Sequence, residues 1–183
     1  MKIINFLRAR LRKWINEEIW LEDYINAGLK LGKNVSIQPE VTFDISHAWL
    51  IEIGDNVILA PQVYLLAHDT STKMKTSYVK IGKIKIGNNC FVGARAFIMP
   101  GVEIGACSIV GAGSVVTKSF PERVVIAGNP AKIICSVEEY EQKLEKELQD
   151  LPKFGSEYTL HGGVTAEMKQ EMINKIERFG FVK

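Results

Sequence analysis

Three histidines carry much of the chemistry that this sequence could offer: His47, His68 and His161. Imidazole gains and loses a proton near neutral pH, so a histidine beside a binding face can serve as an acid or a base. His68 stands directly before a polar segment, Asp69 to Val79, that interrupts a regular apolar pattern. It is therefore either part of a functional site or a surface histidine at the entrance of a loop.

Two further residues could act with His68. Asp69 follows it directly and could orient the imidazole, as carboxylates do in other sites, or could simply begin the loop. His47 lies in a shorter break of the same pattern, about three repeats of the pattern (one coil) before His68 once four inserted residues are allowed for. It could bind a substrate, assist His68, or pack beside Trp49 as a structural corner. His161 lies in the C-terminal tail, where we expect no catalytic role.

The histidines also argue against a catalytic metal. A zinc site needs several ligands that converge, and positions 47, 68 and 161 contain no pair with the close spacing of zinc ligands. We therefore expect no metal.

An apolar residue recurs at every sixth position through the middle of the chain. A period of six fits neither a helix nor a hairpin ladder, but it fits a solenoid with three short strands per turn. Glycines that often follow the apolar residue would occupy corners, where positive φ or a close backbone approach is needed. Such coils bury their faces only against neighbouring coils. The series comprises Leu31, Ile37, Phe43, Ile53, Leu59, Leu65, Ile86, Val92, Ile98, Ile104, Val110 and Val116.

Helical patterns flank the solenoid. Apolar residues at helical spacing predict a helix over residues 3–25, and Gly28 could end it. Ser136 and Glu139 form a capping box for a helix that reaches Asp150, and Thr165 could cap a last helix that ends near Gly180. We expect an N-terminal helical cap (1–30), a solenoid domain (31–134) with a loop at 69–79, and a C-terminal helical tail (135–183).

The composition is that of an ordinary globular protein. A net charge of +2 over 183 residues is too small to indicate nucleic-acid binding. The three cysteines are odd in number, and Cys90 and Cys107 fall at apolar repeat positions, which favours a reducing cytoplasm. No apolar run approaches the roughly 20 residues of a membrane span. Basic and apolar residues within positions 1–20 could lie on an anionic membrane surface, or the segment could cap the coil.

The motifs IGDNVILAP, IGNNCFVGARAFIMPGVEIG, VGAGSVVTK and VIAGNPAK resemble the hexapeptide-repeat acyltransferases. Within that family the sequence is most similar to the maltose/galactoside O-acetyltransferase branch, and especially to bacterial enzymes that O-acetylate surface polysaccharides. The resemblance covers Leu31 to Ile134. It implies an all-β core formed by a left-handed parallel β-helix, a homotrimer with active sites between subunits, and acetyl-CoA as co-substrate without a metal.

The resemblance implies that His68 is the general base, because the family places a histidine before a protruding loop. Removal of the proton from an attacking hydroxyl typically contributes about 10²–10⁴-fold, and the acyl group can pass directly from the thioester to the acceptor. The candidate catalytic residues are thus His68, Asp69 and His47. At the position where the family often has an asparagine that contacts the acceptor, this sequence has Glu40, so that contact is in doubt.

The resemblance also implies where acetyl-CoA binds. Phe91 stands beside the thiol end, Gly93 and Ala94 allow the pantetheine arm to approach, and Ala112 contributes its backbone. Thr117 and Lys118 add further contacts, and Lys132 faces the nucleotide phosphates. Alternatively, Phe91 could fill the repeat, and the two lysines could be solvated.

The sequence therefore predicts an O-acetyltransferase that acts on a sugar hydroxyl in surface-polysaccharide biosynthesis. N-acetylation of an amino sugar and a non-catalytic scaffold are the alternatives. The acceptor itself cannot be read from the sequence.

Overall fold

The computed structural model describes residues 19–183, and the chain divides into two compact units, Met1–Val137 and Glu138–Lys183. Most of the helix predicted over residues 3–25 lies outside the described residues, as does most of the segment predicted to touch a membrane. Its described end is helix α2 (Leu21–Asn26), and the prediction that the helix runs through to residue 25 without a break is wrong, because the backbone of Trp20 is extended and α2 begins after it. None of the helices within residues 19–183 is long and apolar enough to cross a membrane.

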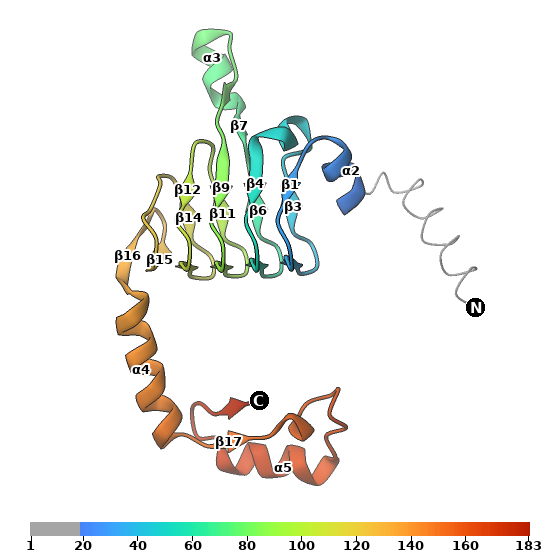
Figure 1. Ribbon diagram of the computed structural model, residues 1–183, viewed down its shortest axis with the longest axis vertical. Coiled ribbons are helices and arrows are strands. Elements are labelled where there is room, and N and C mark those ends of the chain that lie inside the picture. Colours follow the sequence, from blue (N-terminus) through green and yellow to red (C-terminus); the bar gives the residue numbers. More distant parts are fainter. Residues whose placement is uncertain (1–18) are drawn as a thin grey trace, which may run out of the picture. The chain divides into compact units, whose positions relative to one another are not determined.

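The first unit is a coil of short strands that form three parallel sheets (Figure 1). Consecutive strands of the chain enter different sheets, so every third strand pairs with the one that lies a coil earlier. The first sheet contains β1 (Lys30–Leu31), β4 (Ile51–Ile53), β9 (Ile84–Ile86) and β12 (Glu103–Ile104). The second contains β2 (Ser36–Ile37), β5 (Ile58–Leu59), β10 (Phe91–Val92), β13 (Ile109–Val110), β15 (Val124–Gly128) and the antiparallel β16 (Ala131–Ser136). The third contains β3 (Thr42–Phe43), β6 (Tyr64–Leu65), β11 (Phe97–Ile98) and β14 (Val115–Val116).

The six-residue apolar series forms the core of the coil, as the sequence predicts. Ten of its twelve members are buried, and the other two, Leu31 and Ile37 in the first coil, are partly buried. In each sheet the inward residues stack on one another; Ile53, for example, pairs with Leu31 on one side and with Ile86 on the other. Each coil therefore buries its apolar side chains against the next.

Glycines and asparagines at the corners of the coil have different structural roles. The glycines that follow inward residues have ordinary backbone angles and allow close approach: a Cβ at Gly93 would lie 2.5 Å from the amide nitrogen of Ala112. Positive φ occurs at two other corner glycines, Gly101 and Gly113, and at non-glycine residues that include Asn34, Asn56 and Asn89. Their side-chain amides bond from coil to coil, at 3.1 and 3.0 Å, which offsets part of the cost of the left-handed conformation.

The three outer faces of the coil differ in chemistry. The first sheet carries an alternating ladder of Lys30, Glu52, Lys85 and Glu103, with nitrogen–oxygen distances of 3.8 Å for the first two and 3.3 Å for the last two. The second sheet presents the outward, partly or fully exposed residues Ile58, Phe91, Ile109 and Val125. On the third sheet the rings of Tyr64 and Phe97 stack with their centroids 4.9 Å apart. One face is thus charged and two are largely apolar.

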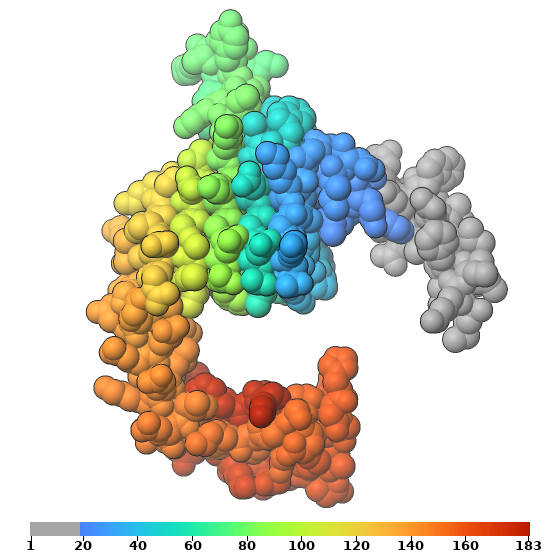
Figure 2. Space-filling model, viewed as in Figure 1, coloured from blue at the N-terminus to red at the C-terminus, as the bar shows by residue number. Residues whose placement is uncertain are grey.

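Two insertions interrupt the coil where the pattern predicts them. The first is the 3-10 segment η1 (Ile45–Leu50). The second comprises β7 (His68–Asp69), η2 (Thr70–Thr72), α3 (Lys73–Thr76) and β8 (Lys80–Ile81). Strands β7 and β8 pair antiparallel, and Figure 2 shows the rest of this insertion standing out from the coil.

The second unit contains most of α4 (Val137–Asp150), then β17 (Lys153–Phe154), η3 (Ser156–Tyr158), α5 (Ala166–Lys175) and β18 (Phe181–Val182). Thr165 caps α5 as predicted, because its Oγ1 accepts a hydrogen bond of 3.2 Å from the Met168 amide. The prediction that this helix continues to near Gly180 is wrong. The backbone becomes extended at Ile176, and the C-terminal residues pair with β17.

Candidate active site

The two insertions leave the coil at the same corner, next to each other. Strands β3 and β6 are neighbours in the third sheet, with Phe43 paired to Leu65. The residues just after them are therefore also neighbours, and the Asp44 amide donates to the Leu65 carbonyl at 2.9 Å. This register brings the start of η1 against the residues that lead to His68.

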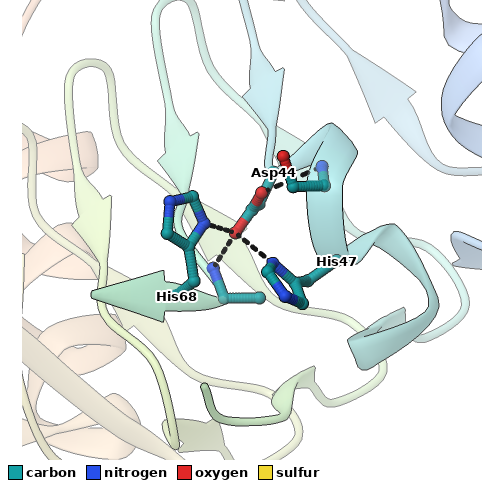
Figure 3. Close-up of polar contacts among 5 residues, drawn as sticks. Asp44, His47 and His68 are labelled. Atoms are coloured by element: carbon teal, nitrogen blue, oxygen red, sulfur yellow. Dashed lines mark hydrogen bonds and ion pairs between the residues drawn. The ribbon is translucent and has the colours of Figure 1, made fainter. Parts of the chain in front are cut away.

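Asp44 is the centre of the site. Its side chain is buried, and the residue is only 4% exposed. One oxygen accepts from the Ser46 amide at 3.1 Å, and the other accepts from the Ala67 amide at 3.1 Å and from His68 Nδ1 (Figure 3). Because an ionised carboxylate can only accept, His68 Nδ1 carries the proton of that bond. The Nε2 atom of His68 is then left with a free lone pair, which suits a base.

His47 lies on the other side of the same carboxylate. Its Nδ1 is 3.7 Å from Asp44 Oδ2, too far for a hydrogen bond, and this buried atom has no hydrogen-bond partner within residues 19–183. The His47 ring lies 5.2 Å from the His68 ring and 5.4 Å from the Trp49 ring, between centroids. His47 thus contacts both the predicted catalytic histidine and the predicted structural neighbour.

Histidines without the close sequence spacing of zinc ligands nevertheless meet in space. His47 and His68 are 21 positions apart but stand on neighbouring coils, and together with Asp44 they offer ligand atoms within 4.8 Å of one another. Such a set of nitrogen and oxygen atoms could hold a transition metal. However, Asp44 Oδ2 already accepts two hydrogen bonds, which favours a role in placing a proton.

Asp69 has a different place from Asp44. Its carboxylate accepts from the Ser71 amide at 2.9 Å and caps η2. Hydrogen bonds from Ser71 lower the pKa of Asp69, with smaller contributions from the charges of Lys80 and His68. The structure therefore supports the reading of Asp69 as the start of the loop, and it is Asp44 that holds His68.

Asp44 is the site residue that sequence reasoning missed. One signal was available in the repeat. Asp44 follows the inward Phe43 just as Leu66 follows the inward Leu65, which predicts that Asp44 lies next to the segment that leads to His68. Glu40 is at the other end of β3, where its carboxylate accepts from Gln62 at 2.5 Å and Gln62 in turn accepts from Arg95 at 2.6 Å. Glu40 therefore belongs to a structural corner, away from His68.

Five of the residues expected to bind acetyl-CoA lie on the second sheet or at its corner with the third. Phe91 points outward from β10 and is 41% exposed, so it does not fill the repeat. Gly93 is buried, and Ala94 and Ala112 follow at the corner, joined through the bond from the Gly113 amide to the Ala94 carbonyl. Lys132 is exposed on β16. A Cβ at Gly113 would meet nothing within 4 Å, so this corner faces open space.

Thr117 and Lys118 lie elsewhere. They are exposed at the far end of β14, the edge of the third sheet that also leads to His68. Strand β14 lies two coils from β6, the strand that leads to His68, which is about 9–10 Å at the usual strand spacing. Ala112 precedes β14, whereas Thr117 and Lys118 follow it, so the length of this strand separates them. Within one chain the structure thus places the expected acetyl-CoA contacts in two groups.

The cysteines take no part in this arrangement. Cys90 is buried, and its burial raises the pKa of the thiol. The prediction that Cys107 fills an apolar repeat position is wrong, because Cys107 is a partly exposed corner residue with a φ of 56°.

Comparisons with known proteins point in one direction. The model of the family described as the hexapeptide repeat of succinyl-transferase matches residues 83–118. A putative acetyltransferase of Bacillus subtilis (strain 168), YvoF, is 34% identical over 139 residues, which cover 75% of this chain and 77% of that protein. The galactoside O-acetyltransferase of Escherichia coli (strain K12) is 36% identical over 130 residues, 67% of this chain and 63% of that enzyme. The match therefore spans slightly less than two thirds of the galactoside enzyme.

Among solved structures, the chain is similar to a hexapeptide-repeat acetyltransferase of Vibrio cholerae, VCA0836, in complex with acetyl coenzyme A. The TM-score is 0.54 at 28% identity, and the match covers 60% of each chain.

Proposed function

The chain belongs to the hexapeptide-repeat acetyltransferases, and on this premise we propose that it transfers an acetyl group from acetyl-CoA to a sugar hydroxyl. The similarity to a galactoside O-acetyltransferase supports the sugar, and the surface-polysaccharide setting follows the resemblance of its motifs. The observation that carries the proposal is the pair formed by buried Asp44 and His68.

The geometry of this pair indicates which part each of the two residues takes in acetyl transfer. His68 Nε2 accepts the proton of the attacking hydroxyl as the new oxygen–carbon bond forms, and later returns it to the leaving sulfur. Asp44 keeps the Nδ1 proton in place and stabilises the imidazolium that forms. Acetyl-CoA, when bound, supplies an acyl group already activated as a thioester, so no enzyme nucleophile is needed.

The residues that would hold acetyl-CoA form the two groups described above. Phe91, Ala94, Ala112 and Lys132 offer an aromatic side chain, an open corner and a cation for a phosphate, while Thr117 and Lys118 lie on the His68 side of the third sheet. A site between two neighbouring copies would bring both groups to one molecule of acetyl-CoA.

The proposal includes a homotrimer with active sites between subunits, and the similarity to hexapeptide-repeat acetyltransferases supports a left-handed winding of the coil. The outward residues of the second and third sheets are largely apolar and would be covered in such an assembly. Light scattering should give a mass about three times 20.5 kDa. The free thiols of Cys90, Cys107 and Cys135 support a reducing cytoplasm as the compartment.

The substitution His68→Ala tests the function. We expect thiol release from acetyl-CoA in the presence of a sugar acceptor to fall about 10²–10⁴-fold, with unchanged acetyl-CoA affinity by calorimetry and unchanged mass. His161→Ala, in the exposed tail, is the matched control and should behave as the wild type. Near-normal turnover in His68→Ala would contradict the mechanism, and amino-sugar acceptors assayed in parallel distinguish O- from N-acetylation.

A further inference from the structure

A tryptophan stands open to solvent beside the active site. Trp49, near the end of η1, is 56% exposed. It forms part of the lining of a depression of about 230 Å3 on the side of the charged first sheet. The Trp49 ring lies 5.4 Å from the His47 ring, which is in turn 5.2 Å from the His68 ring, between centroids, so Trp49 links the depression to the catalytic corner.

The position of Trp49 is fixed by its neighbours. Gly28 has a φ of +101°, and a Cβ there would lie 2.9 Å from the Trp49 Cβ, so only glycine leaves room for the tryptophan backbone. The preceding residue, Ala48, is completely buried. An exposed aromatic ring on such a firmly packed backbone offers contact area at a low entropic cost.

The depression is positively charged. Its lining includes Lys30, Lys83 and Lys85 but only one acid, Glu52. Glu52 approaches Lys30 at 3.8 Å, and Lys85 approaches Glu103 at 3.3 Å. Lys83 is exposed and forms no ion pair with any residue in the range 19–183. Lys83 is therefore the cation left for a ligand.

We propose that this depression binds an acidic sugar residue of the acceptor saccharide, next to the residue that is acetylated. The apolar C–H face of a pyranose ring would pack on the Trp49 ring, whose face is electron-rich. The carboxylate of the sugar would pair with Lys83. The volume is below the about 300–1,000 Å3 of drug-sized sites, which suits a single monosaccharide unit. This inference rests on the proposed function, since it names the class of acceptor.

Binding of a saccharide pair to the full-length protein tests the proposal. Calorimetry would compare hexagalacturonate with maltohexaose, a neutral oligomer of the same length. We expect the acidic oligomer to bind about tenfold more tightly at about 20 mM salt, and this preference to shrink at about 200 mM salt, where charges are screened. Equal affinities for the two oligomers at low salt would overturn the proposal.

Variants then locate the binding. Trp49→Ala should weaken hexagalacturonate binding about tenfold, and Lys83→Ala should weaken it about threefold while leaving maltohexaose unaffected. Lys73→Ala, an exposed lysine of the second insertion, is the matched control and should change nothing. Unchanged binding in both Trp49→Ala and Lys83→Ala would overturn the site. Because Lys83 is exposed, Lys83→Ala keeps the test valid if Trp49→Ala folds poorly.

The two proposals fail in different ways. Acetyl transfer to a small neutral sugar depends on His68 and not on Trp49, so its absence from the wild type would remove the proposed function. Selective binding of the acidic oligomer through Trp49 and Lys83 can be measured without turnover, in His68→Ala as well as in the wild type. Transfer without that selectivity would leave the function standing and overturn the acidic subsite.

Discussion

The two insertions that leave the coil at one corner differ in how they are built. The first, η1, is short and packed: it follows the buried Asp44, contains the buried Ala48, and carries His47 and Trp49. The second is longer and largely exposed, and neither η2 nor α3 contains a buried residue. Its Met74 is 87% exposed. Only its first residue, His68, enters the site. The chemistry thus lies where the insertions leave the rigid coil, and their length contributes little to it.

The largest effect should come from the residue that joins the two insertions. We expect Asp44→Asn to lower kcat about 10²–10⁴-fold, because an amide in place of the carboxylate permits the wrong imidazole tautomer and no longer stabilises the imidazolium. Acetyl-CoA affinity should change little, while the melting temperature should fall, because the new amide NH2 faces a backbone N–H from which the carboxylate accepted a hydrogen bond. A thiol-release assay alongside calorimetry would measure this, and a loss confined to KM would contradict a role through His68.

An intermediate effect is expected within the first insertion. His47→Gln keeps a polar side chain of similar size but removes the imidazole beside Asp44. We expect kcat to fall about tenfold, since His47 Nδ1 lies 3.7 Å from Asp44 Oδ2 and influences the charge there. Steady-state kinetics with a varied acceptor would separate the remaining alternatives: a change in acceptor KM alone indicates substrate binding, and no change indicates packing against Trp49.

A small effect is expected at the start of the second insertion. Asp69→Asn should alter kcat by no more than about twofold, because its carboxylate caps η2 and His68 is held by Asp44. The pKa of Asp69 is lowered in the folded protein. Its stabilising contribution is therefore present above the unfolded pKa and is lost as pH falls through the folded value. Melting curves should differ between the two proteins at neutral pH and converge in acid. A large loss of activity would indicate that Asp69 is a catalytic residue after all.

No effect is expected from removal of metals. Dialysis against EDTA should leave acetyl transfer unchanged, because the two acceptor positions used on Asp44 Oδ2 are filled by Ala67 and His68. Metal analysis before and after dialysis would provide the control. A loss of activity restored by zinc would show that the corner residues Asp44, His47 and His68 serve as ligands.

The repeat made the coil and its breaks predictable, while the site depended on contacts between coils. A period of six marks the inward residues because each strand contributes one side chain to the core, and a lost period marks an insertion. The bond from His68 to Asp44 joins residues 24 positions apart, and it depends on strand register together with the path of a short insertion. Positive φ at Asn34, Asn56 and Asn89 was also missed, since glycine is the usual expectation for that conformation.

The same dependence on distant register explains the end of α5. Its helical pattern continues toward Gly180, but the Phe181 amide bonds the Pro152 carbonyl at 2.8 Å and the C-terminal residues form β18. Pairing with a strand some thirty positions earlier outweighs the local preference for helix.

The alternating charges on the first sheet also bear on how the chain reaches its fold. Solenoid coils are so alike that a chain could skip one and still satisfy most apolar contacts. Here, skipping a coil would place Lys30 beside Lys85, or Glu52 beside Glu103, where the native order pairs each lysine with a glutamate. Like charges directly opposite one another destabilise strand pairing. The alternating charges therefore disfavour strand pairings that skip a coil, on the one outer face that is not apolar.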